Sequence, residues 1–263
     1  MIEWVAWASC VVGALLAGLG LVKAIPDRTV LGMGIIFYSL TLHTYSPLLI
    51  FGERQPLTTE DRIWGATFAV LGGWSFLILA LAVLHASRTQ KEDWANPALR
   101  RDLSILSIAA VSSALALRLE LSSGHFAPTA DFLNVYGDDH RVVLYQLTFL
   151  PWIAVPVGVL GYMTWKYSSG LSKVVTIAGC MCGVLWGIWK LTGVVFRFVA
   201  GDSIGIESPV SVGLGFLTVL LVICGLGIFG AGNAWRRVSA MISYGWSRRV
   251  DDARHQDPKR IES

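Results

Sequence analysis

Lys190 is the residue whose type and position most strongly indicate chemistry. It lies deep in an apolar segment, after Trp186 and Trp189 and before the apolar residues 193–196. A cation at mid-membrane costs roughly 2.5 to 3.5 kcal/mol on insertion scales, so its side chain should face the bundle interior or a wet cavity. Arg197 follows on the same helix face, nearer the outside. The pair predicts a polar path suited to an anionic solute; the alternative is a structural lysine that bonds backbone carbonyls.

His43 is the second candidate for the lining of such a cavity. It lies slightly past the midpoint of an apolar segment that runs in the same direction as that of Lys190, so we expect the two residues at similar depth. Pro47 cannot donate the hydrogen bond that the carbonyl of His43 would otherwise accept. That carbonyl, with Tyr45 and Ser46 nearby, is a predicted acceptor for the lysine ammonium. The alternative is a histidine that serves only in hydrogen-bonded packing.

A polar loop, residues 120–141, holds several groups that could bind a metal ion: His125, Asp131, Asp138, Asp139 and His140. Histidine and carboxylates can bind zinc or a harder divalent ion, but their spacing here is not diagnostic of either. We therefore expect a solvated acidic loop that caps the start of the following helix, and no metal site. Asp138 or Asp139 should instead favour the dipole of the following helix at its N-terminus. A pairing of one of them with Arg197 is a further hypothesis.

Several kinds of site are not supported by the sequence. No Asp or Glu lies in the middle of an apolar segment, so Lys190 and His43 are the predicted carriers of any proton. The missing carboxylate counter-ion argues against retinal, and a single histidine at membrane depth argues against paired haem ligands. No nucleophile elbow, phosphate loop, dinucleotide fingerprint or zinc-protease pattern occurs. We therefore expect neither catalysis nor a cofactor.

Membrane helices are the elements that should position these residues. Of 263 residues, 54% are hydrophobic and 15% are charged, against roughly 25% charged residues in a soluble domain. The net charge of +3 is too small to predict nucleic-acid binding. Seven apolar segments can cross, or nearly cross, a hydrocarbon core of roughly 30 Å as helices. They are residues 2–22, 30–51, 63–84, 103–119, 142–165, 174–200 and 209–230.

The basic residues divide unequally between the two predicted sides of the membrane. Of the 21 Lys and Arg residues, 15 lie on one side and 5 on the other, and Lys190 lies within a helix. The more basic side is cytoplasmic by the positive-inside rule, so we expect the N-terminus outside and the C-terminus inside. The five outer residues are Arg54, Arg62, Arg118, Arg141 and Arg197.

The chain should divide into a transmembrane domain, residues 1–233, and a basic segment, residues 234–263. Apolar side chains recur every three or four residues from Trp235 to Trp246, with arginines on both sides. This pattern is typical of a short amphipathic helix on the inner leaflet. A solvated juxtamembrane tail is the alternative. The residues from Asp252 onward should be disordered.

Four short motifs follow one another in the second half of the chain. They are RRDL at 100–103, DFLNVY at 131–136, YMTWKY at 162–167 and GVLWGIWK at 183–190. Their order resembles a seven-helix family of actinobacterial membrane proteins that are labelled as transporters. The resemblance covers roughly residues 95 to 230. It implies a seven-helix fold and transport, and it assigns no role to any residue.

We therefore expect an all-α, seven-helix integral protein of a bacterial plasma membrane that transports a small, anionic solute. The predicted cavity lining is Lys190, His43, Arg197 and Tyr45. The alternative function is a non-catalytic sensor or assembly partner that receives a ligand or partner on its outer acidic loop. That loop holds Asp138, Asp139 and His140. Expected partners are the lipid bilayer and the solute, with a homo-oligomer or a second membrane protein left open, and no nucleic acid.

Overall fold

The computed structural model describes most of the chain, and the described part is helical. It covers residues 2–23, 26–45, 55–89, 94, 96–201, 210–211, 213–222, 224–225 and 228. Its helices are α1 (Ile2–Val22), α2 (Pro26–Tyr45), α3 (Thr59–Thr89), α4 (Pro97–Ser122), α5 (Phe132–Tyr136), α6 (His140–Phe149), α7 (Pro151–Tyr167) and α8 (Gly170–Ala200). A shorter apolar helix, Gly213–Val222, follows. Within these ranges there is no strand, so the predicted all-α class is confirmed for them.

Some of the sequence-based predictions fall outside the described residues. Ser46 and Pro47 lie there, as do several residues of the predicted segment 209–230. The predicted amphipathic helix and tail, residues 234–263, lie there entirely.

Four helical spans are long and apolar enough to cross a membrane. They are Thr59–Ala86, Pro97–Ser122, His140–Lys166 and Gly170–Ala200. Large apolar side chains point away from the bundle along them; Ile108 on α4 and Val174 on α8 are 67% and 65% exposed. Apolar faces of this extent are uncommon on soluble monomers, whereas lipid solvates them. The four spans therefore indicate a membrane protein.

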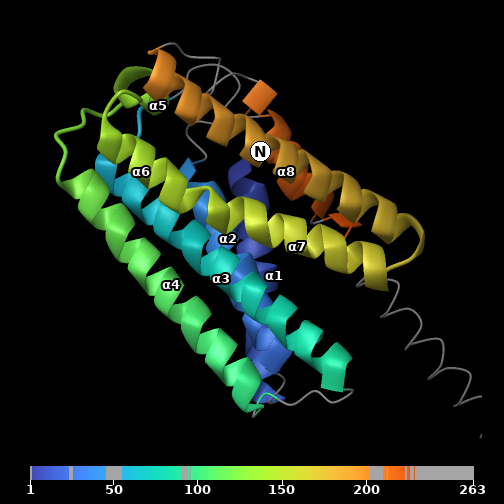
Figure 1. The fold of residues 1–263 in the computed structure, drawn as a ribbon. Coiled ribbons are helices and arrows are strands. Elements are labelled where there is room, and N and C mark those ends of the chain that lie inside the picture. The colour runs from blue at the N-terminus through green and yellow to red at the C-terminus, as the bar shows by residue number, and fades with distance from the viewer. Residues whose placement is uncertain are drawn as a thin grey trace, which may run out of the picture.

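The helix α3 lies at the centre of the bundle (Figure 1). It packs against α2 on one side and against α4, α6 and α7 on the others, while α1 packs against α2. The helix α8 packs mainly against α7 and much less against α6. In Figure 1, α4 and α8 therefore lie at opposite edges, with α3, α6 and α7 between them.

Residues 123–139 fold over one end of the bundle and include α5. We call them the cap, and this end the capped end. The ends of α2, α4 and α8 and the starts of α3 and α6 meet there, as the contacts described below show (Figure 1). The cap is attached to the segment before α3 by an isolated antiparallel bridge between Leu57 and Thr129.

The predicted fifth segment, residues 142–165, is divided into two helices by a proline. The helix α6 ends at Phe149, and α7 begins with Pro151, whose missing N–H and fixed φ suit a first helical position. The backbone N–H of Leu150 still donates to the carbonyl of Gln146 at 2.9 Å, so the chain continues in nearly the same direction. The two helices together form one apolar span.

A second proline creates the main polar contact in the middle of the bundle. Pro156 lies inside α7 and cannot donate to the carbonyl of Trp152. The hydroxyl of Tyr38 on α2 donates to that carbonyl instead, at 3.0 Å. Gly73 on α3 approaches the same carbonyl so closely that a Cβ atom there would overlap it. This contact, the Trp152 contact, joins α2, α3 and α7.

Candidate functional site at the capped end

Arg62 is the most deeply buried charged side chain at the capped end, with 4% of its surface exposed. It lies in the first turn of α3, which starts earlier than the predicted segment because Thr58 and Asp61 cap it reciprocally. The backbone N–H of Thr58 donates to the Asp61 carboxylate at 3.0 Å, and the backbone N–H of Asp61 donates to the Thr58 hydroxyl at 3.2 Å. This arrangement is a variant of the capping box. The helix that starts in this way carries the Arg62 side chain inside the bundle.

The guanidinium of Arg62 binds the cap in two ways. Its Nη2 donates to the backbone carbonyl of Thr129 at 2.6 Å, and its Cζ lies 4.3 Å from the centre of the Phe132 ring. The carbonyl dipole and the negative ring face both stabilise a desolvated cation. Among the described residues no carboxylate forms an ion pair with Arg62. Its side chain therefore serves to hold the cap.

Two tyrosines meet beneath Arg62. The hydroxyl oxygens of Tyr45 on α2 and Tyr145 on α6 lie 2.9 Å apart. Each also lies near the backbone carbonyl oxygen of Arg62, at 3.4 and 3.5 Å respectively. One hydroxyl can thus donate to the other and the second to the carbonyl. Tyr45, predicted to line a cavity, is placed in this three-helix contact.

Arg141, in the first turn of α6, binds both ends of the cap. Its Nη1 donates to the carbonyl of Ser123 at 2.7 Å, and its Nη2 lies 3.1 Å from Oδ2 of Asp139. The Asp139 side chain caps α6 by accepting from the backbone N–H of Arg141 at 2.8 Å. Burial raises the pKa of Asp139, but the hydrogen bonds and charge of Arg141 outweigh it and hold the pKa below its usual value. The predicted capping role of Asp139 is confirmed.

Arg197, in the last turn of α8, binds the side of the cap that faces α8. Its Nη2 lies 3.2 Å from Oδ2 of Asp138 and donates to the carbonyl of Asn134 at 3.2 Å. Its Nη1 donates to the carbonyl of Gly201, which ends α8 in the left-handed region at φ 70°. The hypothesis that Arg197 pairs with Asp138 is confirmed. The Arg197 side chain is 17% exposed and that of Asp138 is 64% exposed.

The three arginines act in the same way, because each donates to a backbone carbonyl of the cap. The carbonyls belong to Thr129, Ser123 and Asn134. Aromatic rings fill the space between them, with neighbouring ring centres 5.1 to 6.4 Å apart. These rings belong to Phe126, Phe132, Tyr136 and Tyr145. The cap is therefore packed into the bundle, whereas the sequence predicted a solvated loop.

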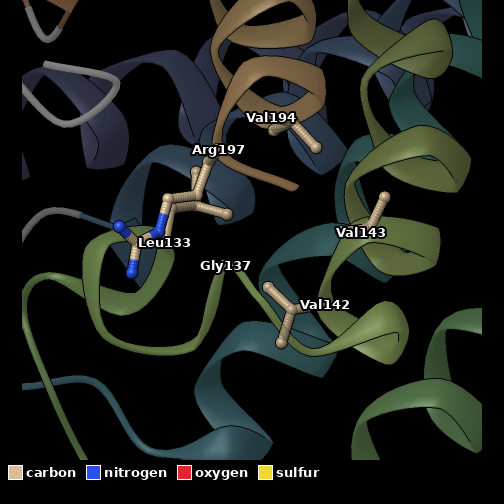
Figure 2. Close-up of a pocket in the computed structure, with 6 residues that line it drawn as sticks. All are labelled: Leu133, Gly137, Val142, Val143, Val194 and Arg197. Atoms are coloured by element: carbon tan, nitrogen blue, oxygen red, sulfur yellow. The ribbon is translucent and has the colours of Figure 1, made fainter. Parts of the chain in front are cut away.

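A small hollow lies where the cap, α6 and α8 meet (Figure 2). It contains about 160 Å³ of unfilled space, open solvent included, and has no internal room for a water molecule. Its lining is Leu133, Gly137, Val142, Val143, Val194 and Arg197. Figure 2 shows the guanidinium of Arg197 turned away from the three valines. The hollow is thus an apolar seam and does not offer a polar cavity for a solute.

The remaining predicted residues lie on different elements. The ring of His43 is exposed and lies 5.2 Å from the ring of Trp7, on the side of α1. Lys190 is half-buried on α8. The helices α2 and α8 are not among the pairs that pack extensively. His140 is 71% exposed, with Nδ1 3.7 Å from Oδ1 of Asp139.

No group of three or more His, Cys, Asp or Glu side chains in the described part of the chain is arranged to hold a metal ion. The contacts observed at the capped end are hydrogen bonds, ion pairs and aromatic packing. The arrangement can bind, release and position the cap.

The sequence did not predict that Arg62, Phe132 and Tyr145 lie together at the capped end. Arg62 was assigned to the outer basic residues because the apolar run starts one residue later. A usable signal was present in the cap itself, since a predicted solvated loop contains Phe126, Phe132 and Tyr136. Aromatic side chains at that density indicate a loop that packs against the protein.

Comparisons with models of protein families, with functionally characterised proteins and with solved structures find no match to this chain. The resemblance to a seven-helix transporter-labelled family therefore stays a prediction, and the functional argument depends on the geometry of the capped end.

Proposed function

We propose that this chain is a polytopic membrane protein that acts without catalysis, as a sensor or assembly partner, and that the cap is its receiving surface. The observation that carries this proposal is the use of the three arginines. The guanidinium groups of Arg62, Arg141 and Arg197 all donate to backbone carbonyls of the cap and hold it in place. The hollow beside them has no room for a water molecule. A surface that is packed onto the bundle in this way suits recognition of a partner better than passage of a solute.

The topology that we propose has seven crossings, with the N-terminus and the cap outside a bacterial plasma membrane. It is supported by the 15 basic residues on the opposite side against 5 on this side. The meeting of helix ends and starts at the capped end also agrees with alternating crossings. In this topology the basic segment, residues 234–263, is on the cytoplasmic side.

The cap offers a mixed acidic and apolar surface to such a partner. The side chain of Asp138 in the cap is 64% exposed, and that of the adjoining His140, the first residue of α6, is 71% exposed. Val135 of α5 is 53% exposed on the same segment. An apolar group surrounded by polar ones is typical of protein interfaces. We therefore expect a protein partner with basic groups around an apolar contact.

Site-specific photocrosslinking in native membranes tests this function. A photoreactive residue at Val135 should give a discrete crosslinked species, and His140→Gln should weaken it. The control is the same residue at Leu171, which is 67% exposed at the start of α8. A species that forms equally at Leu171, or no species at any exposed cap position, would contradict the proposal.

Transport of a small anion is the second candidate function. It is favoured by Arg197, whose stem lines the hollow, and by Lys190, half-buried on the same helix. An anion that binds the folded protein should raise its melting temperature in detergent. Lys190→Met should abolish that rise, while Arg118→Gln, on the exposed side of α4, should retain it. If no anion in a broad panel raises the melting temperature, this candidate fails.

A further inference from the structure

We propose that the ion pair between Arg197 and Asp138 is a latch on the seam between the cap, α6 and α8, and that its release opens the hollow to water. This inference goes beyond the proposed function, since it concerns a motion of the capped end whichever partner or solute is involved.

The seam is formed by three separate elements. Leu133 and Gly137 come from the cap, Val142 and Val143 from α6, and Val194 and Arg197 from α8. The hollow between them holds about 160 Å³ of empty volume, open solvent included, and has no internal room for a water molecule. Leu133, Val142 and Val194 belong to the buried core, so an opening of the seam would expose their side chains to water.

The helix α8 packs closely against α7 and against the helix Gly213–Val222. Its glycines allow close contact, since a Cβ on Gly187 would lie 2.9 Å from Cβ of Ala154 on α7. A Cβ on Gly183 would lie 2.7 Å from Cγ2 of Thr218 in the following helix. By contrast, α8 packs only lightly against α6. Movement of α8 is therefore easiest at the seam.

Arg197 joins α8 to the cap through hydrogen bonds. They reach the Asp138 carboxylate and the Asn134 carbonyl. The aliphatic stem of Arg197 also lies over Gly137, where a Cβ atom would be 2.7 Å from its Cγ. One side chain thus closes the seam both by charge and by covering it.

The two sides of the cap are held with unequal strength. Arg62 is 96% buried, stacks on Phe132 and donates to Thr129, so water does not compete for it. Asp138 is 64% exposed, and an ion pair in contact with water is weak and screened by salt. The cap should therefore release first from α8 and stay bound to α3 and α6.

Cysteine accessibility in the full-length protein tests the latch. In a background with Cys10, Cys180, Cys182 and Cys224 replaced by alanine, Val194→Cys reports on the seam, because Val194 is 2% exposed. The protein is reconstituted into liposomes and treated with a membrane-impermeant maleimide. Asp138→Asn should speed alkylation about fivefold, which corresponds to about 1 kcal/mol of ion-pair energy. High salt should speed the reaction of the parent and leave that of Asp138→Asn unchanged.

Two controls separate the latch from general loosening. Glu60→Gln changes an exposed carboxylate in the first turn of α3, at the same end of the bundle, and should leave the rate at position 194 unchanged. A cysteine at Ala66, fully buried on α3, should stay unreactive in Asp138→Asn. If Val194→Cys fails to fold, Val142→Cys, also fully buried, reports from the opposite wall. An unchanged rate in Asp138→Asn, or equal acceleration at Ala66, would overturn the proposal.

Discussion

The capped end and the Trp152 contact hold helices together by opposite means. At the capped end, three cationic side chains donate to carbonyls of an irregular segment. In the middle of the bundle, one neutral hydroxyl donates to a carbonyl that a proline has left free, and a glycine lets the helices approach. The difference follows from the distance to water, because a charged side chain has a small free-energy cost near the membrane interface and a large one at the centre of a bilayer.

This comparison teaches which contacts can open. Neutral contacts in the middle of the bundle have no water to replace a lost hydrogen bond, so we expect them to stay closed. Charged contacts at the capped end differ among themselves, since Arg62 is buried whereas Asp138 meets solvent. Flexibility should therefore be confined to the α8 side of the cap.

The largest expected effect is that of Arg62→Met. The substitution leaves the carbonyl of Thr129 without its donor and removes the cation from the Phe132 ring. Together these losses should lower the free energy of unfolding by about 3 kcal/mol, measured in mixed detergent micelles. Arg118→Met, at an exposed position on α4, is the matched control and should have little effect. Equal values for the two variants would remove the distinction between buried and exposed arginines.

Gly73→Ala tests the Trp152 contact. The new Cβ would overlap the carbonyl oxygen of Trp152, so α3 and α7 must separate. Overpacking of this kind costs about 1 to 3 kcal/mol, and we expect about 2 kcal/mol. Gly18→Ala on α1 is the control, because nothing lies within 4 Å of its Cβ position. A stabilising Gly73→Ala would show that the helices approach less closely than the contact implies.

The positions of the helices could largely be predicted from the sequence. The segment 2–22 coincides with α1, and the segment 174–200 ends where α8 ends. Apolar run length determines these bounds because the run must match the hydrocarbon core. The start of α3 at Thr59 was missed, since the polar pair of Thr58 and Asp61 extends the helix beyond its apolar residues.

The candidate site could be predicted only in part. Asp138 and Arg197 were paired on charge and side of the membrane, which needs no knowledge of helix packing. The contact of Arg62 with Thr129 joins residues 67 positions apart, and no periodicity reveals such a pair. The principle that a proline frees a carbonyl for another donor was applied to His43; in the described residues it operates at Trp152.

Tyr38→Phe removes the donor from the Trp152 carbonyl without changing its packing. Interhelical hydrogen bonds in membrane proteins contribute about 0.6 to 1.7 kcal/mol, so we expect a loss of about 1 kcal/mol. Tyr162→Phe, where the ring is 62% exposed, should be neutral. The free energy of unfolding in micelles is again the measurement. If both variants are neutral, the glycine and not the hydroxyl determines the strength of this contact.

The smallest expected effect is the acid sensitivity of the Asp139 cap. Because Arg141 holds the pKa of Asp139 below its usual value, the ionised carboxylate stabilises the folded state. This stability is fully present above the ordinary pKa of about 3.9 and is lost as the pH falls below it. Asp139→Asn keeps a capping group but cannot titrate, so its stability relative to the parent should improve between neutral pH and about pH 3. We expect the difference in free energy of unfolding between the two proteins to change by less than about 1 kcal/mol over this pH range. If the free energies of unfolding of the two proteins fall in parallel with pH, the pair of Asp139 and Arg141 does not contribute to the acid sensitivity of the capped end.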